Sequence, residues 1–193
     1  VIDSALSQIS QWQAEQPKVP LNVSVNIAAI QIQQPNFVDR LQILLTAHPN
    51  VDPKYLELEV LETSALDDVL HVSEIMANSM KLGIAFALDD FGAGHSTLRY
   101  FLSHQFEILK IDRDFVAPIV TSDRATSLCE SMLDFAHRLG GRAVAEGVEN
   151  IAQLRKLRAI GYCYAQGYYF ARPMPLDEFL TIQHTFELPS IEP

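Results

Sequence analysis

Two adjacent carboxylates, Asp89 and Asp90, are the residues of this sequence whose types and spacing point most directly to chemistry. An apolar run over residues 83–88 precedes them and predicts a buried strand. A loop punctuated by Gly92 and Gly94 follows them. Two acids side by side at a strand end are costly unless a positive charge lies between them, and a divalent metal ion commonly supplies it. A solvated acidic turn would show the same pair, so the pair alone leaves both interpretations open.

Six predicted strands alternate with helices along the chain. The predicted strands cover residues 21–26, 55–60, 83–88, 106–112 and 142–146, and a sixth lies within 162–170. The predicted helices cover a first segment that ends at Pro17 and residues 37–47, 67–81, 96–102, 122–139, 150–160 and 176–186. Regular alternation of this kind indicates a parallel sheet with helices packed outside it.

The number of strands narrows the fold class. A closed (β/α)8 barrel has eight strands and typically about 250 residues, whereas this chain has 193 residues and opens on a helix. No glycine-rich dinucleotide fingerprint follows the first predicted strand, so a Rossmann fold has no support. We therefore expect an α/β fold, a TIM-like (β/α)8 barrel that lacks its N-terminal strands and retains about six strand–helix units.

Polar residues stand at or just after the ends of successive predicted strands, where such a barrel places its active site. They are Asn26, Glu59, Asp89, Asp90, Lys110, Asp112, Glu146 and Gln166. The five carboxylates and two amides of this set make an oxygen-rich site suited to one or two Mg²⁺ or Mn²⁺ ions. Two such ions can activate water for phosphodiester hydrolysis, and a lysine among the acids can orient that water. Each residue taken singly is better explained by solvation, a salt bridge or a cap; the joint pattern indicates a site.

Composition excludes several classes of function. With 48% hydrophobic residues the chain can form one domain with a substantial core. A formal net charge of −10 argues against binding a nucleic-acid polymer. Cys129 and Cys163 form no metal or disulfide pattern, and no apolar run approaches 18 residues. We expect a cytoplasmic domain, and a membrane anchor elsewhere in a longer parent chain is compatible with this pattern.

Several motifs together resemble one known family, the EAL domain of bacterial cyclic di-GMP phosphodiesterases. The motifs are Asp-Asp-Phe-Gly-Ala-Gly at 89–94, Lys-Ile-Asp at 110–112, Ala-Glu-Gly-Val-Glu at 145–149, Gln-Gly-Tyr at 166–168, and, more loosely, Val-Asn at 25–26 and Glu-Val-Leu-Glu at 59–62. The resemblance implies a TIM-like barrel in which one strand runs antiparallel. It also implies hydrolysis of cyclic di-GMP to linear pGpG with Mg²⁺ or Mn²⁺.

The resemblance also implies a role for each matching residue. Asn26, Glu59, Asp89, Asp90 and Asp112 would be metal ligands. Lys110 would position the attacking water, and Glu146 would be a further metal-site carboxylate or the general base. Gln166 would line the site near the substrate, and Glu62 would hold the loop after Asp90 in its working shape.

Domain organisation and partners follow from the same resemblance. The phosphodiesterase domain would cover residues 1–187, and residues 188–193 would form a tail. The family tends to form homodimers through the region after Asp90, and regulatory domains are frequent neighbours in longer chains. The alternative function is a receptor that binds cyclic di-GMP without cutting it, and a third is a barrel used only for protein contacts. Retention of Lys110, Asp112 and Glu146 favours the enzyme.

The sequence also departs from the family pattern. The name-giving Glu-Ala-Leu stretch, whose glutamate is a metal ligand, and a nearby substrate-binding arginine belong to a strand ahead of the first helix and do not occur in this chain. Leu61 and Ala93 stand where threonines are usual, and His95 where a tyrosine is usual. All three lie in or beside the region that couples the loop to the dimer.

The loop position Ala93 gives a first prediction. Because Ala93 lacks the hydroxyl that ties the loop down in the family, we expect Ala93→Thr to change metal occupancy or dimer coupling modestly. Metal titration and analytical ultracentrifugation of both proteins provide the measurement. Equal activity and equal dimerisation in the two proteins would contradict it.

Overall fold

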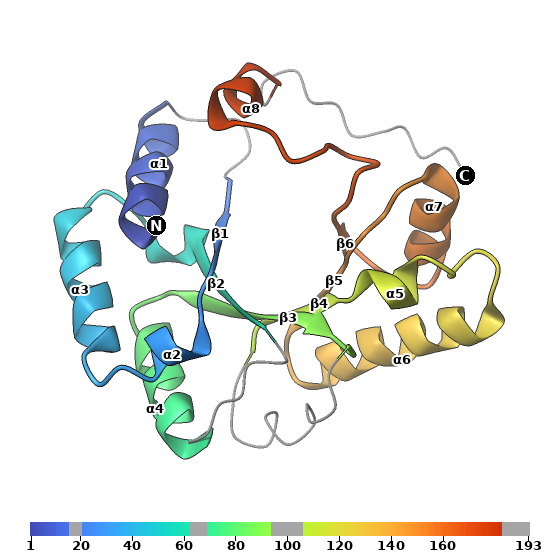
Figure 1. Cartoon of the computed structure of the whole chain (residues 1–193), viewed down its shortest axis with the longest axis horizontal. Coiled ribbons are helices and arrows are strands. Elements are labelled where there is room, and N and C mark those ends of the chain that lie inside the picture. Colours follow the sequence, from blue (N-terminus) through green and yellow to red (C-terminus); the bar gives the residue numbers. More distant parts are fainter. Residues whose placement is uncertain (16–20, 62–68, 94–105, 183–193) are drawn as a thin grey trace. The chain divides into compact units, whose positions relative to one another are not determined.

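A computed structural model describes residues 1–15, 21–61, 69–93 and 106–182 of the chain (Figure 1). The chain divides into two compact units. The first comprises residues 1–109 and 139–141, and the second comprises residues 110–138 and 142–193. The boundary falls inside strand β4 (Ile108–Ile111), so Lys110 is among the first residues of the second unit.

The first unit contains three strands and the helices between them. Its elements are α1 (Ile2–Glu15), β1 (Val23–Asn26), α2 (Ala29–Ile32), α3 (Phe37–Ala47), a 3-10 turn η1 (Pro53–Tyr55), β2 (Leu56–Leu61), α4 (Val69–Met80) and β3 (Ala85–Phe91). Strand β2 pairs in parallel with β1 on one side and with β3 on the other. Helices thus connect β1 to β2 and β2 to β3, as the alternating pattern predicts.

The three strands of the first unit have one apolar and one polar face. Val25, Leu58 and Phe86 are in register across β1, β2 and β3, and all three are buried. Side chains alternate between the faces along a strand, so the neighbouring registered row lies on the opposite face. That row contains Asn26 and Glu59. The sheet therefore presents apolar side chains to one side and functional side chains to the other.

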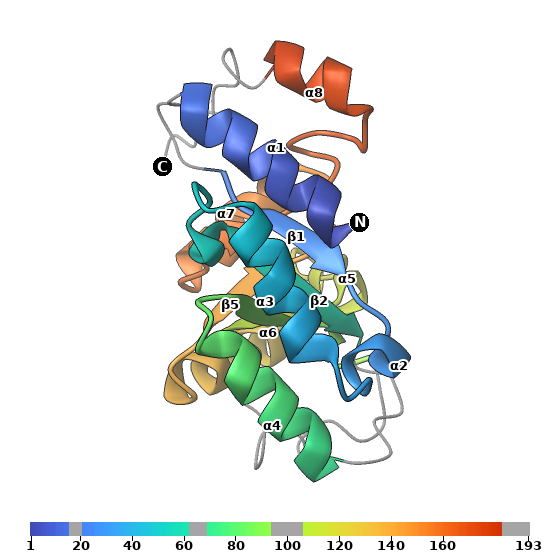
Figure 2. The ribbon, with the colours of Figure 1, turned by 90° about the vertical axis from the view of Figure 1, so that its left-hand side faces the viewer.

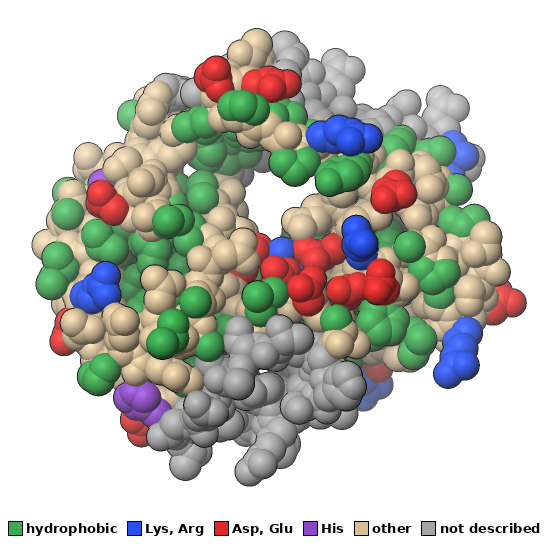
Figure 3. Space-filling model, in the orientation of Figure 1, with side chains coloured by type: hydrophobic (Ala, Val, Ile, Leu, Met, Phe, Trp, Pro, Cys, Tyr) green, Lys and Arg blue, Asp and Glu red, His purple; other side chains and the backbone are tan. Residues whose placement is uncertain are grey.

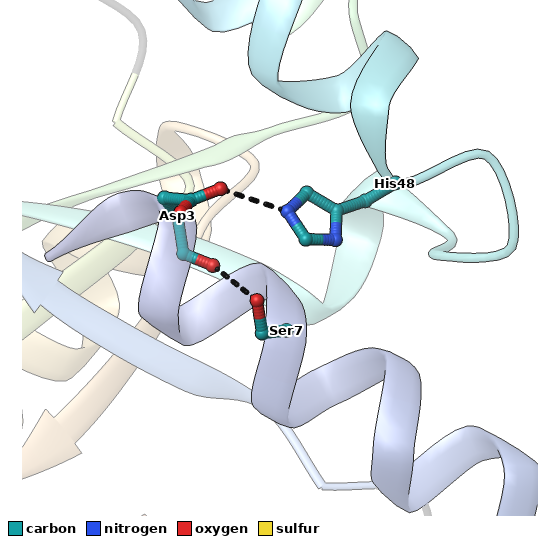
Figure 4. A network of polar contacts seen from close by, with 3 residues as sticks. All are labelled: Asp3, Ser7 and His48. Atoms are coloured by element: carbon teal, nitrogen blue, oxygen red, sulfur yellow. Dashed lines mark hydrogen bonds and ion pairs between the residues drawn. The ribbon is translucent and has the colours of Figure 1, made fainter.

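Helices α1, α3 and α4 cover the first unit's strands and lie side by side in Figure 2. Leu6 and Ile9 of α1 and Leu41 of α3 are almost fully buried, so they supply core against the apolar face. The beginning of α1 is linked to the end of α3 (Figure 4), because Asp3 Oδ1 lies 2.9 Å from His48 Nε2. The Ser7 hydroxyl donates to the Asp3 carbonyl at 3.0 Å in the same network.

The second unit is built around the end of β4 and two further strands. Its elements are α5 (Arg113–Val116), α6 (Asp123–Arg138), β5 (Arg142–Ala145), α7 (Ile151–Ala159), β6 (Tyr164–Ala165) and α8 (Leu176–Ile182). Strands β5 and β6 pair in parallel, with Val144 in register with Tyr164. Buried residues of α6, including Cys129 and Leu133, form the unit's core.

The predicted long elements are confirmed with small shifts at their ends. The helix predicted at 37–47 is α3, and those predicted at 122–139 and 150–160 are α6 and α7. The prediction missed the short helices α2 and α5, because four residues give no helical period to detect. The helix predicted at 96–102 lies outside the described residues. Every strand pair whose register the structure gives is parallel, so the antiparallel strand stays a prediction.

Strand β3 extends further than predicted. The sequence pattern ends it at Leu88, but the strand continues through Phe91 and so includes Asp89 and Asp90. Pairing with β2 explains the extension, because Leu61 is in register with Asp89. Within the described ranges, no helix is both long enough and apolar enough to cross a membrane.

The two cysteines give the second prediction. Burial raises the pKa of the Cys129 thiol to about 11 from its ordinary 9.0, so the folded protein holds that proton more tightly than the unfolded chain. Stability present below pH 9 is therefore lost as the pH rises toward 11. At pH 8 we expect a thiol reagent to modify the exposed Cys163 and to reach Cys129 only after denaturation. Rapid modification of both thiols in the native protein would contradict this.

Candidate active site

The predicted site residues fall into two sets, one in each unit. The first unit carries Asn26, Glu59, Asp89 and Asp90, and the second carries Lys110, Asp112, Glu146 and Gln166. Glu62, predicted to hold the loop after Asp90, lies outside the described residues.

Strand pairing brings Asn26 and Glu59 together in the first unit. Their Cα atoms are partners in the β1–β2 register, and the Ile27 N–H donates to the Glu59 carbonyl at 2.9 Å. Registered residues of parallel strands project from the same face, so the amide and the carboxylate are neighbours. Ala87 is the β3 residue in register with Glu59, and its methyl group leaves room beside that carboxylate. Glu59 is only 7% exposed.

The backbone at Asp90 adopts a left-handed conformation, with φ at 55°. Aspartate tolerates this region better than most residues, at a cost of about 1 kcal/mol or more. The conformation interrupts the strand alternation, so Asp89 and Asp90 are not forced to opposite faces as they would be in a regular strand. A turn follows directly, in which the Ala93 N–H donates to the Asp90 carbonyl at 3.1 Å. Local strain of this kind concentrates at functional sites.

The donors of the first set fit a hard divalent cation. Asn26, Glu59, Asp89 and Asp90 offer carboxylate and amide oxygens and no sulfur or imidazole. Mg²⁺ and Mn²⁺ prefer such oxygen ligands, while Zn²⁺ and copper favour nitrogen and sulfur. Glu59 is a buried carboxylate, and a bound cation would offset part of the cost of burying its charge.

A second carboxylate, Glu57, lies two residues before Glu59 on the same face of β2. The sequence analysis did not identify it. It is 8% exposed and accepts hydrogen bonds from Asn22 Nδ2 at 2.7 Å and from Ser24 Oγ at 3.1 Å. The alternation of Leu56, Glu57, Leu58 and Glu59 could have revealed it, because period-2 alternation places both glutamates on one face. Because two side chains donate hydrogen bonds to it, the Glu57 carboxylate is stabilised within the protein and has a structural role.

A buried ion pair organises the second set. Lys110 Nζ lies 2.8 Å from Glu146 Oε1, and the two side chains are only 8% and 12% exposed. Gln166 Nε2 donates to the same oxygen at 2.5 Å. The three residues come from the ends of β4, β5 and β6, as predicted. A lysine and a carboxylate held this closely can orient a water molecule and accept its proton.

Asp112 has a local structural role in addition to its predicted one. It is the N-cap of α5, and its Oδ1 accepts a hydrogen bond from the Asp114 N–H at 2.6 Å. A capping carboxylate satisfies an amide that the first turn leaves without a partner. Arg113 and Asp114, the first residues of α5, are both exposed. Figure 3 shows acidic and basic side chains next to each other on this face of the molecule.

The loop after β5, residues 146–150, is held by backbone hydrogen bonds on two sides. The Glu146 N–H donates to the Ile111 carbonyl at 3.1 Å, and the Val148 N–H donates to the Gln166 carbonyl at 3.0 Å. A Cβ added at Gly167 would lie 2.2 Å from the Val148 carbonyl oxygen, so only glycine permits this approach. The loop that carries Glu146 is therefore fixed against the ends of β4 and β6.

Comparison with known proteins identifies a family. The family model of the EAL domain matches residues 1–173. The protein named probable cyclic di-GMP phosphodiesterase PdeN of Escherichia coli is 36% identical over 175 residues, covering 89% of this chain and 33% of that protein. The chain spans only about a fifth to a third of the length of the curated relatives first matched.

Solved structures agree with the family match and confirm the predicted fold class. The EAL domain of Mycobacterium smegmatis DcpA superposes with a TM-score of 0.89 at 26% identity, covering 97% of this chain and 84% of that one. The PaMucR phosphodiesterase in complex with c-di-GMP gives a TM-score of 0.82 at 30% identity, covering 92% and 71%. Both neighbours are EAL domains or EAL-type phosphodiesterases, whose fold is a TIM-like barrel.

The buried ion pair gives the third prediction. Lys110→Met keeps the length of the side chain but leaves the Glu146 carboxylate without its cation. Because one partner of a buried pair then remains charged, we expect the free energy of unfolding to fall by about 3 kcal/mol. Urea denaturation at pH 7 in metal-free buffer measures it. The double variant Lys110→Met, Glu146→Gln should recover most of the loss, and a single variant as stable as the parent would refute the pair's role.

Proposed function

Because the chain belongs to the EAL domain family, we propose that it hydrolyses the bacterial second messenger cyclic di-GMP to linear pGpG. The observation that carries the proposal is the arrangement of Lys110, Glu146 and Gln166, in which one carboxylate oxygen accepts from both other side chains. A protein that only binds the dinucleotide has no need of a lysine–carboxylate pair able to orient water. Relatives named as cyclic di-GMP phosphodiesterases support the choice of substrate.

The proposal assigns the metal-binding role to oxygen ligands in both units. Asn26, Glu59, Asp89 and Asp90 would hold one Mg²⁺ or Mn²⁺ ion. Asp112 would help to hold a second ion, and Glu146 would be a further metal-site carboxylate or the general base. When bound, such ions lower the pKa of coordinated water and stabilise the charge that develops on phosphate oxygens. The oxygen-only donors of the first unit support this assignment.

The remaining residues act on the attacking water and on the substrate. Hydrolysis adds the water oxygen to phosphorus and breaks one ester bond of the cyclic dinucleotide. A proton passes from the water to a base, and the released sugar oxygen takes up a proton from the solvent to become a hydroxyl. Lys110 would orient the water through its ammonium group, and Glu146, 2.8 Å from that group, would accept the proton. Gln166 would fix the orientation of Glu146 through its hydrogen bond and contact the substrate from the end of β6.

The organisation of the protein is part of the same proposal. We infer that residues 1–187 form the phosphodiesterase domain, that it acts in the cytoplasm, and that it forms homodimers through the region after Asp90. The turn at Asp90 and Ala93 supports a structured start to that region. Regulatory domains would reside in a longer chain, in keeping with the greater length of the matched relatives.

Chromatography of cyclic di-GMP incubated with the protein and Mn²⁺ tests the proposed hydrolysis and gives the fourth prediction. We expect pGpG to form and Glu146→Ala to lower turnover at least about 100-fold, because a general base typically contributes that much. Glu149→Ala, three residues further along the same loop and exposed, is the matched control for loss of an acid.

The outcomes separate the candidate functions. Binding of the dinucleotide without turnover would favour a receptor, and absence of binding would favour a domain used for protein contacts. In either case the assay is repeated on the chain preceded by a Glu-Ala-Leu segment, since no such tripeptide occurs in the sequence. Continued absence of pGpG would overturn the proposed hydrolysis.

A further inference from the structure

Gln153 is a buried polar residue that the proposed chemistry does not use. It lies in the first turn of α7 and is 5% exposed. Its Oε1 accepts hydrogen bonds from the N–H groups of Glu149 and Asn150, at 2.8 and 3.3 Å. Its Nε2 donates to the Ala117 carbonyl at 3.1 Å, across 36 residues of sequence. One side chain therefore joins two segments that are distant in the chain.

The set of partners requires a glutamine. Two backbone N–H groups need an acceptor, and a backbone carbonyl needs a donor, so the orientation of the amide is fixed. Glutamate could accept both N–H groups but would place a carboxylate against the Ala117 carbonyl. Methionine has a similar volume but could replace neither contact. The Asn150 side chain completes a capping box by accepting from the Gln153 N–H at 3.0 Å.

The two joined segments both lead to residues of the candidate site. Glu149 and Asn150 end the loop that begins at Glu146. Ala117 is the C-cap of α5, whose N-cap is Asp112, two residues after Lys110. A Cβ at Gly147 would lie 2.4 Å from the Arg113 Cβ, so the loop and α5 are also in close contact at their other ends. The position of Glu146 relative to Lys110 thus depends on how this loop docks on α5.

We propose that Gln153 is a positioning residue that holds the 146–150 loop against α5 and thereby sets the place of the Glu146 carboxylate beside Lys110. Its catalytic consequence rests on the proposed hydrolysis, whereas the docking itself does not. Loss of the amide should release the loop from its far end and allow the carboxylate to shift. A shift of about 1 Å at a reacting group can cost about 100-fold in rate.

Amide hydrogen exchange tests the docking independently of activity. In Gln153→Met we expect the N–H groups of Glu146, Val148, Glu149 and Asn150 to exchange about tenfold faster, because the loop opens locally. Leu154→Ala is the control, since it removes a buried side chain of the same helix and leaves the Gln153 amide in place. Faster exchange confined to Asn150 and α7, with Glu146 and Val148 unchanged, would mean simple fraying of the helix and would overturn the proposal.

Steady-state kinetics provides the second readout. We expect Gln153→Met to lower kcat about ten- to 100-fold with KM changed less than about threefold, because the loop places the base rather than the substrate. Gln153→Glu, which keeps the two acceptor contacts, should lie between the parent and Gln153→Met. A kcat in Gln153→Met equal to that of Leu154→Ala would overturn the positioning role. A parent protein that forms no pGpG, even when a Glu-Ala-Leu segment precedes it, would instead refute the proposed hydrolysis, and the exchange data would still decide the docking.

Discussion

The pairing of Lys110 with Glu146 is the interaction on which the second unit's arrangement depends. Two opposite charges, each about nine-tenths buried, are tolerable only at hydrogen-bond distance, since either alone would face a large desolvation cost. That distance requires the end of β4, the start of the loop after β5 and the end of β6 to be held together. The backbone hydrogen bonds from Glu146 to Ile111 and from Val148 to Gln166 meet this requirement. The ion pair therefore requires the strand ends to be held together, and the hydrogen bonds between the strand ends keep the two charges at the required distance.

The first unit also contains buried acidic side chains, but they lie on the polar face of its strands. Its strands place apolar side chains toward α1, α3 and α4, and this leaves the opposite face to polar residues. Glu57 is satisfied there by Asn22 and Ser24, while Glu59, next along the same face, is equally buried. Glu57 thus accepts hydrogen bonds from two side chains, and Glu59 lies in register with Asn26, whose amide oxygen is also of the type that suits a cation. The same β2 strand supplies a structural acid and a candidate metal ligand.

The sequence allowed us to predict that the polar residues at the strand ends belong to a site. The reason is that parallel strands present their carboxyl ends at one edge of a sheet. It also predicted the long helices, such as α6, because sixteen residues give several repeats of the helical period. It could not assign the partner of Lys110, since Glu146 is 36 positions away and only the tertiary fold selects it among the acids. The positive φ of Asp90 could likewise not be predicted from the sequence, because an aspartate permits that conformation but does not require it. The Asn150–Gln153 capping box, by contrast, has a spacing that a search for helix starts could have found.

The left-handed backbone of Asp90 also bears on how such a domain can evolve. Most residues are penalised in this conformation, but asparagine and glycine adopt it at little cost. Aspartate codons are a single base away from codons for both. One nucleotide change can therefore remove the carboxylate and keep the local fold intact. For a domain with the proposed activity, this is a short genetic route from an enzyme to a folded domain that binds the dinucleotide without consuming it.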